Sequence, residues 1–179
     1  MTFDQAWDFT DPIPGSFTRR SGEAYYRYAL QVPPGEVIVE VGVDQGRSAS
    51  LLLQAAELTG ARLVLVDSWE SVLIDNLAKV LTLVGDFPGV NAEIIHARSV
   101  EAAKRVPGPI AMVHIDANHY DDNPANDCEA WLPKLKSGGI ACFHDVHSSF
   151  PAVTAAVDKY TAGWQDLGEF DGLAIRRKP

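Results

Sequence analysis

The chain has 179 residues, of which 46% are hydrophobic, and this length and composition fit one folded domain with a substantial core. Its formal net charge of -9, from 24 acidic and 15 basic residues, argues against nucleic acid as a partner, because neutralising phosphates requires clustered basic side chains. No apolar stretch approaches the ~20 residues of a membrane span and no signal peptide is recognisable, so we expect a cytoplasmic protein.

The first 36 residues are interpreted as an arm and a helix that cap the substrate side of a domain formed by residues 37–179. Residues 1–20 contain two prolines and a glycine with little periodicity, which indicates an extended arm. A helix is expected at residues 21–30 and is ended by Pro33-Pro34-Gly35. Its tyrosines either pack the helix on a sheet or line a substrate pocket.

Residues 37–67 predict one βαβ unit. A β-branched run, VIVEV, is typical of a parallel strand that is buried on both faces, and a turn with two glycines follows it. Ser48 is expected to cap a helix that ends at Gly60. The second strand of the unit ends on an acid, Asp67.

Such a unit binds a nucleotide-like ligand where its first strand turns into the helix, and an acid at the end of the second strand can accept hydrogen bonds from a ribose. Asp44 and Arg47 stand where a dinucleotide fingerprint has its second and third glycines, which disfavours a nicotinamide-dependent dehydrogenase. With Glu40 and Asp44 nearby, the turn would repel a pyrophosphate and attract a cation. S-adenosylmethionine, which carries an ammonium and a sulfonium group, is a ligand that this acidic turn would attract. Asp44 taken alone can also be explained as an acid that only caps the turn.

The rest of the chain alternates between helices and strands. Helices are expected at 70–84, 100–106, 122–136 and 151–160, and strands at 92–97, 110–116 and 140–143. Gly138-Gly139 would end the third of these helices. The apolar face of the first would carry Val72, Leu73, Leu77, Val80, Leu81 and Val84. Two further strands, 164–170 and 173–177, flank an Asp171-Gly172 turn, which is typical of a hairpin. The sequence therefore predicts a doubly wound, Rossmann-like α/β fold with a seven-stranded, mostly parallel sheet and a C-terminal antiparallel hairpin.

The chain resembles the class I S-adenosylmethionine-dependent methyltransferases over nearly its whole length. The resemblance rests on VEVGVDQGRS, on the acid that ends the second strand, on HIDANHYDD, on LPKLKSGGIACFHDV and on the terminal hairpin. Within the class, the chain is most similar to the small O-methyltransferases related to the macrocin and catechol enzymes. This resemblance implies an enzyme that transfers a methyl group from S-adenosylmethionine to a hydroxyl of a small molecule.

The resemblance also implies which residues bind the cofactor. These are Glu40, Gly42, Asp44, Gly46, Asp67, Ser68, Arg98, Ser99 and Asp116. Among them, Glu40 and the two glycines would hold the methionine end, Asp67 the ribose hydroxyls, and Arg98 with Ser99 the adenine edge.

The catalytic residues that the resemblance implies are His119, Asp116 and Asp145. Two carboxylates that end neighbouring strands, ~4.8 Å apart, can share a divalent cation such as Mg or Mn. In metal-dependent relatives the third ligand is usually a carboxylate or amide beside the second Asp, whereas this chain has His144 there. An imidazole suits Mn, Fe or Zn better than Mg, so His144 either changes the preferred metal or indicates a degenerate metal site. His119 is the candidate general base, because an imidazole with a pKa of ~6.5 accepts a proton near neutral pH, and helix capping is its alternative role. His114, inside a predicted strand, is expected to be a packing residue.

Two alternatives stay open within the same fold. One is a methyltransferase that acts on nitrogen or carbon, and the other is a module that binds S-adenosylmethionine or another nucleoside without turnover. The cluster of Asp116, His119 and Asp145 argues against a pure binder. The expected partner is a small-molecule substrate, and a homodimer that completes an open pocket is a further hypothesis. Cys128 and Cys142 have no CxxC spacing and indicate neither a disulfide framework nor a zinc site.

Overall fold

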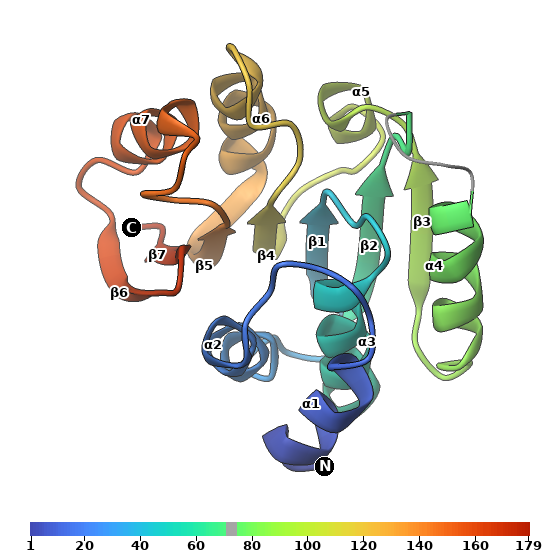
Figure 1. The fold of residues 1–179 in the computed structure, drawn as a ribbon. Helices are drawn as coiled ribbons and strands as arrows, with labels where there is room; N and C mark the ends of the chain where they lie inside the picture. Colours follow the sequence, from blue (N-terminus) through green and yellow to red (C-terminus); the bar gives the residue numbers. More distant parts are fainter. Residues whose placement is uncertain (71–74) are drawn as a thin grey trace.

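The computed structural model describes residues 1–70 and 75–179, and a seven-stranded sheet lies at its centre between two layers of helices (Figure 1). The strands are β1 (Val37–Val41), β2 (Arg62–Asp67), β3 (Ala92–His96), β4 (Ile110–Ile115), β5 (Leu135–Phe143), β6 (Gln165–Phe170) and β7 (Leu173–Arg177). Their order is β3-β2-β1-β4-β5-β7-β6. The first five strands are parallel, β7 runs antiparallel to β5, and β6 runs antiparallel to β7. The predicted fold class is confirmed.

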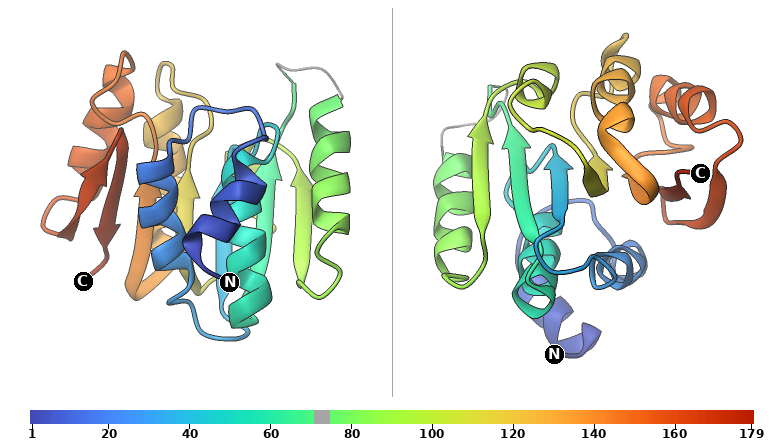
Figure 2. Two further views of the ribbon diagram at one scale, coloured as in Figure 1. Left: turned by 60° about the horizontal axis from the view of Figure 1, so that its bottom comes forward. Right: turned by 180° about the vertical axis from the view of Figure 1, so that it is seen from behind.

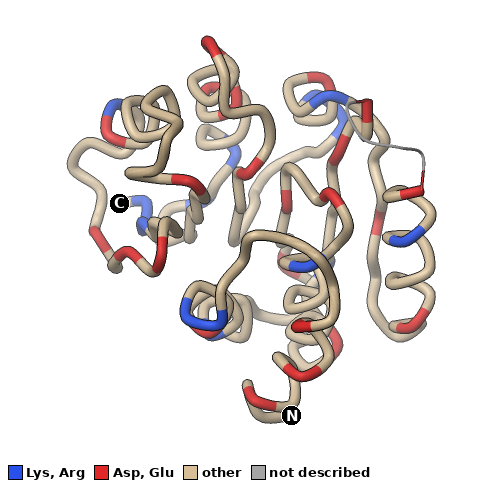
Figure 3. The backbone as a smooth tube through the Cα atoms, in the orientation of Figure 1, with Lys and Arg blue, Asp and Glu red and all other residues tan. Residues whose placement is uncertain are grey.

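Helices cover both faces of the sheet (Figures 1 and 2), and acidic and basic residues are spread over the elements on both faces (Figure 3). One face carries α1 (Phe3–Thr10), α2 (Arg19–Ala29), α3 (Arg47–Thr59) and α4 (Asp75–Gly85), and the other carries α5 (Ser99–Ala103), α6 (Asn123–Trp131) and α7 (Pro151–Tyr160). Successive strand residues point to opposite faces, so Ile38 belongs to the first apolar cluster and Val39 to the second. Burial on both faces explains why the parallel strands read as continuous apolar runs. No helix in the described ranges is long and apolar enough to cross a membrane.

The prediction of an extended arm at residues 1–20 is wrong, because α1 forms within it. Thr2 caps this helix, since its hydroxyl accepts a hydrogen bond from the backbone N–H of Gln5 and the Gln5 side chain accepts one from the N–H of Thr2. This reciprocal pair is a capping box. The helix packs on α3, where the hydroxyls of Thr10 and Ser50 are 2.6 Å apart. Residues 11–18, named here the connecting segment, carry neither helix nor strand.

Several boundaries also differ from prediction. Ser48 does not cap α3, because it is already the second residue of the helix, whose N-cap is Gly46, with φ +91°. The predicted helix at 122–136 is shorter: α6 ends at Trp131, a 3-10 turn follows, and β5 begins at Leu135. Pro133 explains this change, because it has no N–H with which to continue an α-helix.

The predicted helix at 70–84 is described only from Asp75 onward, as α4. Its first apolar positions, Val72 and Leu73, lie outside the described residues. Leu81, predicted for the buried face, is 55% exposed, and Leu83 is buried in its place. The terminal hairpin, the helix at 151–160 and the packing of the tyrosines of α2 are confirmed. The two cysteines are free and buried.

Candidate active site

Two carboxylates, of Asp116 and Asp145, and two imidazoles, of His119 and His144, meet beyond the carboxyl ends of β4 and β5. Nε2 of His119 lies 3.1 Å from Oδ1 of Asp116 and 3.1 Å from Oδ2 of Asp145. Nδ1 of His144 lies 3.6 Å from Oδ2 of Asp116 and 3.4 Å from Oδ2 of Asp145. The structure therefore brings together all four residues that were predicted for catalysis and metal binding.

The backbone that carries these residues continues the strands of the sheet. The N–H of Asp116 donates to the carbonyl of Val41 at 2.8 Å, and the N–H of His144 donates to the carbonyl of Ile115 at 3.2 Å. Asp145 then adopts φ +59°, a left-handed conformation that costs a non-glycine residue of order 1 kcal/mol or more. In this conformation the Asp145 carboxylate lies close to the ligand atoms of Asp116 and His144.

The four side chains shift one another's pKa values. Burial alone would raise the pKa of the Asp116 carboxyl, but the hydrogen bond from His119 and the nearby imidazole of His144 hold that pKa well below its usual range. Burial alone would lower the pKa of His144, but the same carboxylate and that of Asp145 raise it to about 10. The pKa of His119 is also raised, because its hydrogen bond to Asp116 outweighs its burial. The cluster is thus a compact arrangement of opposite charges.

Three of these residues could hold a metal ion. Asp116, His144 and Asp145 each offer a ligand atom, and these atoms lie within 4.8 Å of one another. Two carboxylates and one imidazole suit a divalent transition metal such as Mn. His119 contacts the same two carboxylates, so a bound cation would have to displace its Nε2 from at least one of them.

Aromatic rings cover both histidines, and sequence reasoning identified neither ring. Phe17 of the connecting segment stacks on His144, with centroids 5.2 Å apart and planes at 25°. Phe150 stacks on His119 at 4.7 Å and 20°, and Tyr120 stands edge-on to Phe150 at the solvent-exposed side. These contacts join residues that are far apart in the chain, so no local sequence pattern predicts them.

Asp67 fastens the glycine turn that follows β1. Its Oδ2 accepts hydrogen bonds from the backbone N–H groups of Val43 and Asp44, both at 2.8 Å, and its Oδ1 accepts one from Trp69 at 2.8 Å. The carboxylate of Asp44 accepts a hydrogen bond from Asn76 at 2.8 Å. Both predicted cofactor acids therefore have structural partners, and Oδ1 of Asp67 retains a lone pair for a further donor.

The two glycines of this turn are required by packing inside the protein. A Cβ on Gly42, where φ is +92°, would lie 2.0 Å from the carbonyl oxygen of Asp116. A Cβ on Gly46 would lie 2.7 Å from a methyl carbon of Leu83. The glycines thus let the turn approach the loop after β4 and helix α4, whichever ligand binds there.

The residues predicted for the adenine end lie beyond β2 and β3. Ser68 and Arg98 line one polar groove there, and the Arg98 guanidinium donates to the Glu70 carboxylate, with Nη2 and Oε2 2.7 Å apart. Ser99 is not among the residues that line this groove. Its hydroxyl instead accepts a hydrogen bond from Nε1 of Trp131 at 2.9 Å.

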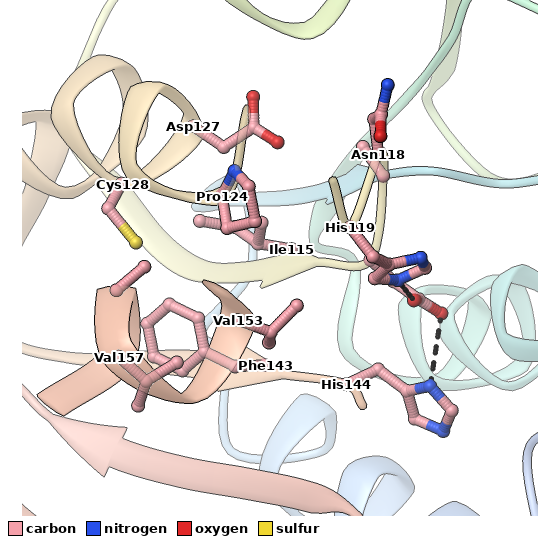
Figure 4. Close-up of a pocket in the computed structure, with 13 residues that line it drawn as sticks. Ile115, Asn118, His119, Pro124, Asp127, Cys128, Phe143, His144, Val153 and Val157 are labelled. Atoms are coloured by element: carbon pink, nitrogen blue, oxygen red, sulfur yellow. Dashed lines mark hydrogen bonds and ion pairs between the residues drawn. The ribbon is translucent and has the colours of Figure 1, made fainter. Parts of the chain in front are cut away.

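A small apolar pocket extends from His119 between β4, β5, α6 and α7 (Figure 4). Figure 4 shows Asp127 on its far side from His144. Asp127 is 3% exposed, and burial raises its pKa to about 6 against an opposing hydrogen bond with Ser99. This buried acid was missed in the sequence, where it reads as one polar residue on a helix.

Arg47 ties the connecting segment to the start of α3. Its guanidinium donates to the carbonyls of Phe17 at 2.9 Å and Asp11 at 2.7 Å, and also to that of Ile13. It also lies over the ring of Trp7, 5.0 Å from the centroid. Arg47, one of the two residues that depart from the dinucleotide fingerprint, thus anchors the connecting segment, in which Phe17 packs on His144.

The chain matches the sequence model of a known protein family. The sequence model of a family described as a methyltransferase domain matches residues 39–146, more than half of the chain. The match runs from β1 through the loop that holds Asp145, so it includes the glycine turn and the whole carboxylate–imidazole cluster.

Solved structures with low sequence identity share the fold. The methyltransferase PaMTH1 of Podospora anserina, solved with S-adenosylhomocysteine bound, is 19% identical with a TM-score of 0.74, over 99% of this chain and 87% of that one. A Staphylococcus aureus protein with a proposed caffeoyl-CoA O-methyltransferase activity is 16% identical with a TM-score of 0.73, over 100% and 93%. CalS11, a TDP-rhamnose 3'-O-methyltransferase, is 18% identical with a TM-score of 0.68, over 98% and 92%.

Proposed function

This chain belongs to the methyltransferase domain family, and from that premise we propose that it transfers a methyl group from S-adenosylmethionine to a hydroxyl of a small molecule. The observation that carries the proposal is the contact of the His119 imidazole with two carboxylates at the sheet edge where the glycine turn lies. A hydroxyl that attacks a methyl group must lose its proton, and this cluster offers a base for that proton.

The cofactor fits the residues on the β1 and β2 side of the sheet edge. S-adenosylmethionine supplies an electrophilic methyl group on a sulfonium. Glu40 has a buried carboxylate oxygen without a partner in the described residues, which suits an ammonium group. Asp67 has a free acceptor position on Oδ1 for a ribose hydroxyl, and Ser68 with Arg98 lines a polar groove for the adenine.

His119 is the proposed general base and Asp116 and Asp145 its partners. Both carboxylates lie 3.1 Å from Nε2 of His119, whose N–H donates a hydrogen bond to Asp116, so Nδ1 carries the lone pair that takes the proton of the acceptor hydroxyl. The same carboxylates stabilise the imidazolium that results. Phe150 holds the ring plane by stacking, so the imidazole has a fixed orientation toward the acceptor. A divalent cation held by Asp116, His144 and Asp145 would stabilise the developing oxyanion.

Calorimetric titration tests this function at its first step. The protein is titrated with S-adenosylmethionine and with NAD, each in EDTA and then with Mg or Mn. We expect binding of S-adenosylmethionine without metal and no heat from NAD. A screen of phenolic, sugar and amine acceptors, read as release of S-adenosylhomocysteine, then identifies the acceptor atom. Binding of neither cofactor would reject the proposal.

A further inference from the structure

A buried polar cluster lies under α2, on the face of the sheet opposite the apolar pocket. Glu40 of β1 and His114 of β4 are paired in register across neighbouring parallel strands, and both side chains are 0% exposed. Nδ1 of His114 lies 3.3 Å from Oε1 of Glu40. Tyr25 of α2 packs on the His114 ring with centroids 4.8 Å apart. These three residues are named here the Glu40 cluster.

Each residue of the Glu40 cluster has a buried polar atom without a hydrogen-bond partner among the residues that the structure describes. These atoms are Oε2 of Glu40, Nε2 of His114 and Oη of Tyr25. Buried polar atoms in folded proteins are almost always paired, because they otherwise lose their hydration without compensation. Three unpaired atoms in one place therefore indicate that a polar ligand group completes the cluster.

We propose that His114 is a positioning residue that holds Glu40 so that its free oxygen receives the ammonium group of the cofactor's amino-acid end. This inference rests on the proposed function. An ionised carboxylate only accepts hydrogen bonds, so the N–H of Nδ1 donates to Oε1 and leaves Oε2 as the free acceptor. The register of β1 with β4 fixes the distance between the two side chains, and Glu40 stands two residues before Gly42 of the turn.

The chemistry of the cluster selects a cation. A carboxylate oxygen that is fully buried beside aromatic rings is poorly solvated, and a positively charged donor compensates it better than a neutral one. Phe17, which packs on both Tyr25 and His114, closes the cluster on the side of the connecting segment. The ammonium group would therefore approach from the side of the glycine turn.

Two nucleoside ligands separate this role from a purely structural one. S-adenosylhomocysteine carries the amino-acid end, and 5'-methylthioadenosine lacks it. In calorimetric titration of the full chain, the wild type is expected to bind the first more tightly. His114→Leu should lower the affinity for S-adenosylhomocysteine about 10- to 100-fold, the range for a hydrogen bond to a charged group, and leave that for 5'-methylthioadenosine unchanged.

Further variants test whether His114 acts through Glu40. His114→Asn keeps an N–H donor near the place of Nδ1 and should restore most of the lost affinity. Glu40→Gln should lose the same discrimination, and adding His114→Leu to it should cause no further loss, because residues that act as a unit are not additive. Tyr26→Phe removes a buried hydroxyl that has no hydrogen-bond partner among the described residues, from the next residue of α2 and outside the Glu40 cluster, and is the matched control, with both affinities at wild-type values.

The affinities of the variants for the two ligands decide whether His114 positions Glu40. Equal loss of both ligands in His114→Leu, or no restoration in His114→Asn, overturns the positioning role. If His114→Leu does not fold, the comparison of His114→Asn with Glu40→Gln carries the test. A wild type that binds both ligands equally overturns the inference and leaves the proposed function standing, whereas a wild type that binds neither rejects both.

Discussion

Nε2 of His119 lies 3.1 Å from Oδ2 of Asp145, a contact that joins the loop after β4 to the loop after β5. The carboxylate on the second loop thereby stabilises a proton on the imidazole of the first. The proposed general base and its partner follow two neighbouring parallel strands, whose register sets the distance between the two loops.

His119→Asn should lower kcat by about 100- to 10,000-fold, the usual effect of losing a general base. Affinity for S-adenosylhomocysteine should stay unchanged, because His119 is not among the proposed cofactor residues. Turnover is measured as release of S-adenosylhomocysteine with the acceptor found by screening. His147→Asn is the matched control, since that exposed histidine pairs with Glu169, and its kcat should equal the wild-type value. An unimpaired His119→Asn would rule out this base.

Asp145→Ala should abolish stimulation of turnover by Mn or Mg and leave cofactor affinity nearly unchanged. The reason is that Asp145 shares the candidate metal site with Asp116 and His144 but is not a proposed cofactor residue. Turnover measured at increasing Mn in otherwise metal-free buffer reports the first effect, and titration with S-adenosylmethionine in EDTA reports the second. Asp158→Ala, at an exposed acid of α7, is the control. Equal loss of metal stimulation and of cofactor affinity would show that Asp145 supports the cofactor site instead.

Much of the sheet could be predicted because the necessary information is local. Short β-branched runs predicted the parallel strands, and the acids that end β2 and β4 marked the edge where the site lies. The four residues of the carboxylate–imidazole cluster were predicted from a resemblance to a family and from the rule that parallel strands end on one edge. The structure places them within contact of one another.

The parts that were missed depend on distant contacts or on competing local signals. Phe17 stacks on His144, and nothing in either neighbourhood of the sequence indicates that pair. At the N-terminus, the prolines and glycine after residue 11 suggested an extended arm, although Thr2 and Gln5 form a capping box ahead of them. In β5, two glycines suggested the end of a helix, whereas the strand runs through both.

Arg47→Lys should destabilise the protein by about 1–3 kcal/mol, because a single ammonium cannot reproduce hydrogen bonds to three separate carbonyls. Those carbonyls belong to the connecting segment, so its susceptibility to proteolysis should rise as well. Urea unfolding and limited proteolysis measure the two effects. Arg27→Lys is the control, since Arg27 is exposed and its guanidinium lies over the Tyr28 ring. Identical unfolding curves for the two variants would contradict the anchoring role.

Asp127→Asn should change how stability depends on pH. Burial raises the folded-state pKa of Asp127 from 3.8 to about 6, so the folded protein binds this proton more tightly than the unfolded chain. Stability should fall as pH rises from about 4 to about 6, by up to about 3 kcal/mol at 1.36 kcal/mol per pKa unit. The variant lacks this loss, so it should be more stable than the wild type at pH 8 and equal to it at pH 4. Parallel pH profiles in urea unfolding would refute the assignment.

Gly42→Ala should be far more destabilising than Gly138→Ala, although both glycines adopt positive φ, +92° and +74°. At Gly138 nothing lies within 4 Å of the added Cβ, so the cost is that of the left-handed backbone, of order 1–2 kcal/mol. At Gly42 the Cβ would lie 2.0 Å from the Asp116 carbonyl, which must move and carry its carboxylate with it. We therefore expect at least about 3 kcal/mol from urea unfolding, together with lost turnover. Equal stability of the two variants would show that the turn does not need this close approach to hold Asp116 in place.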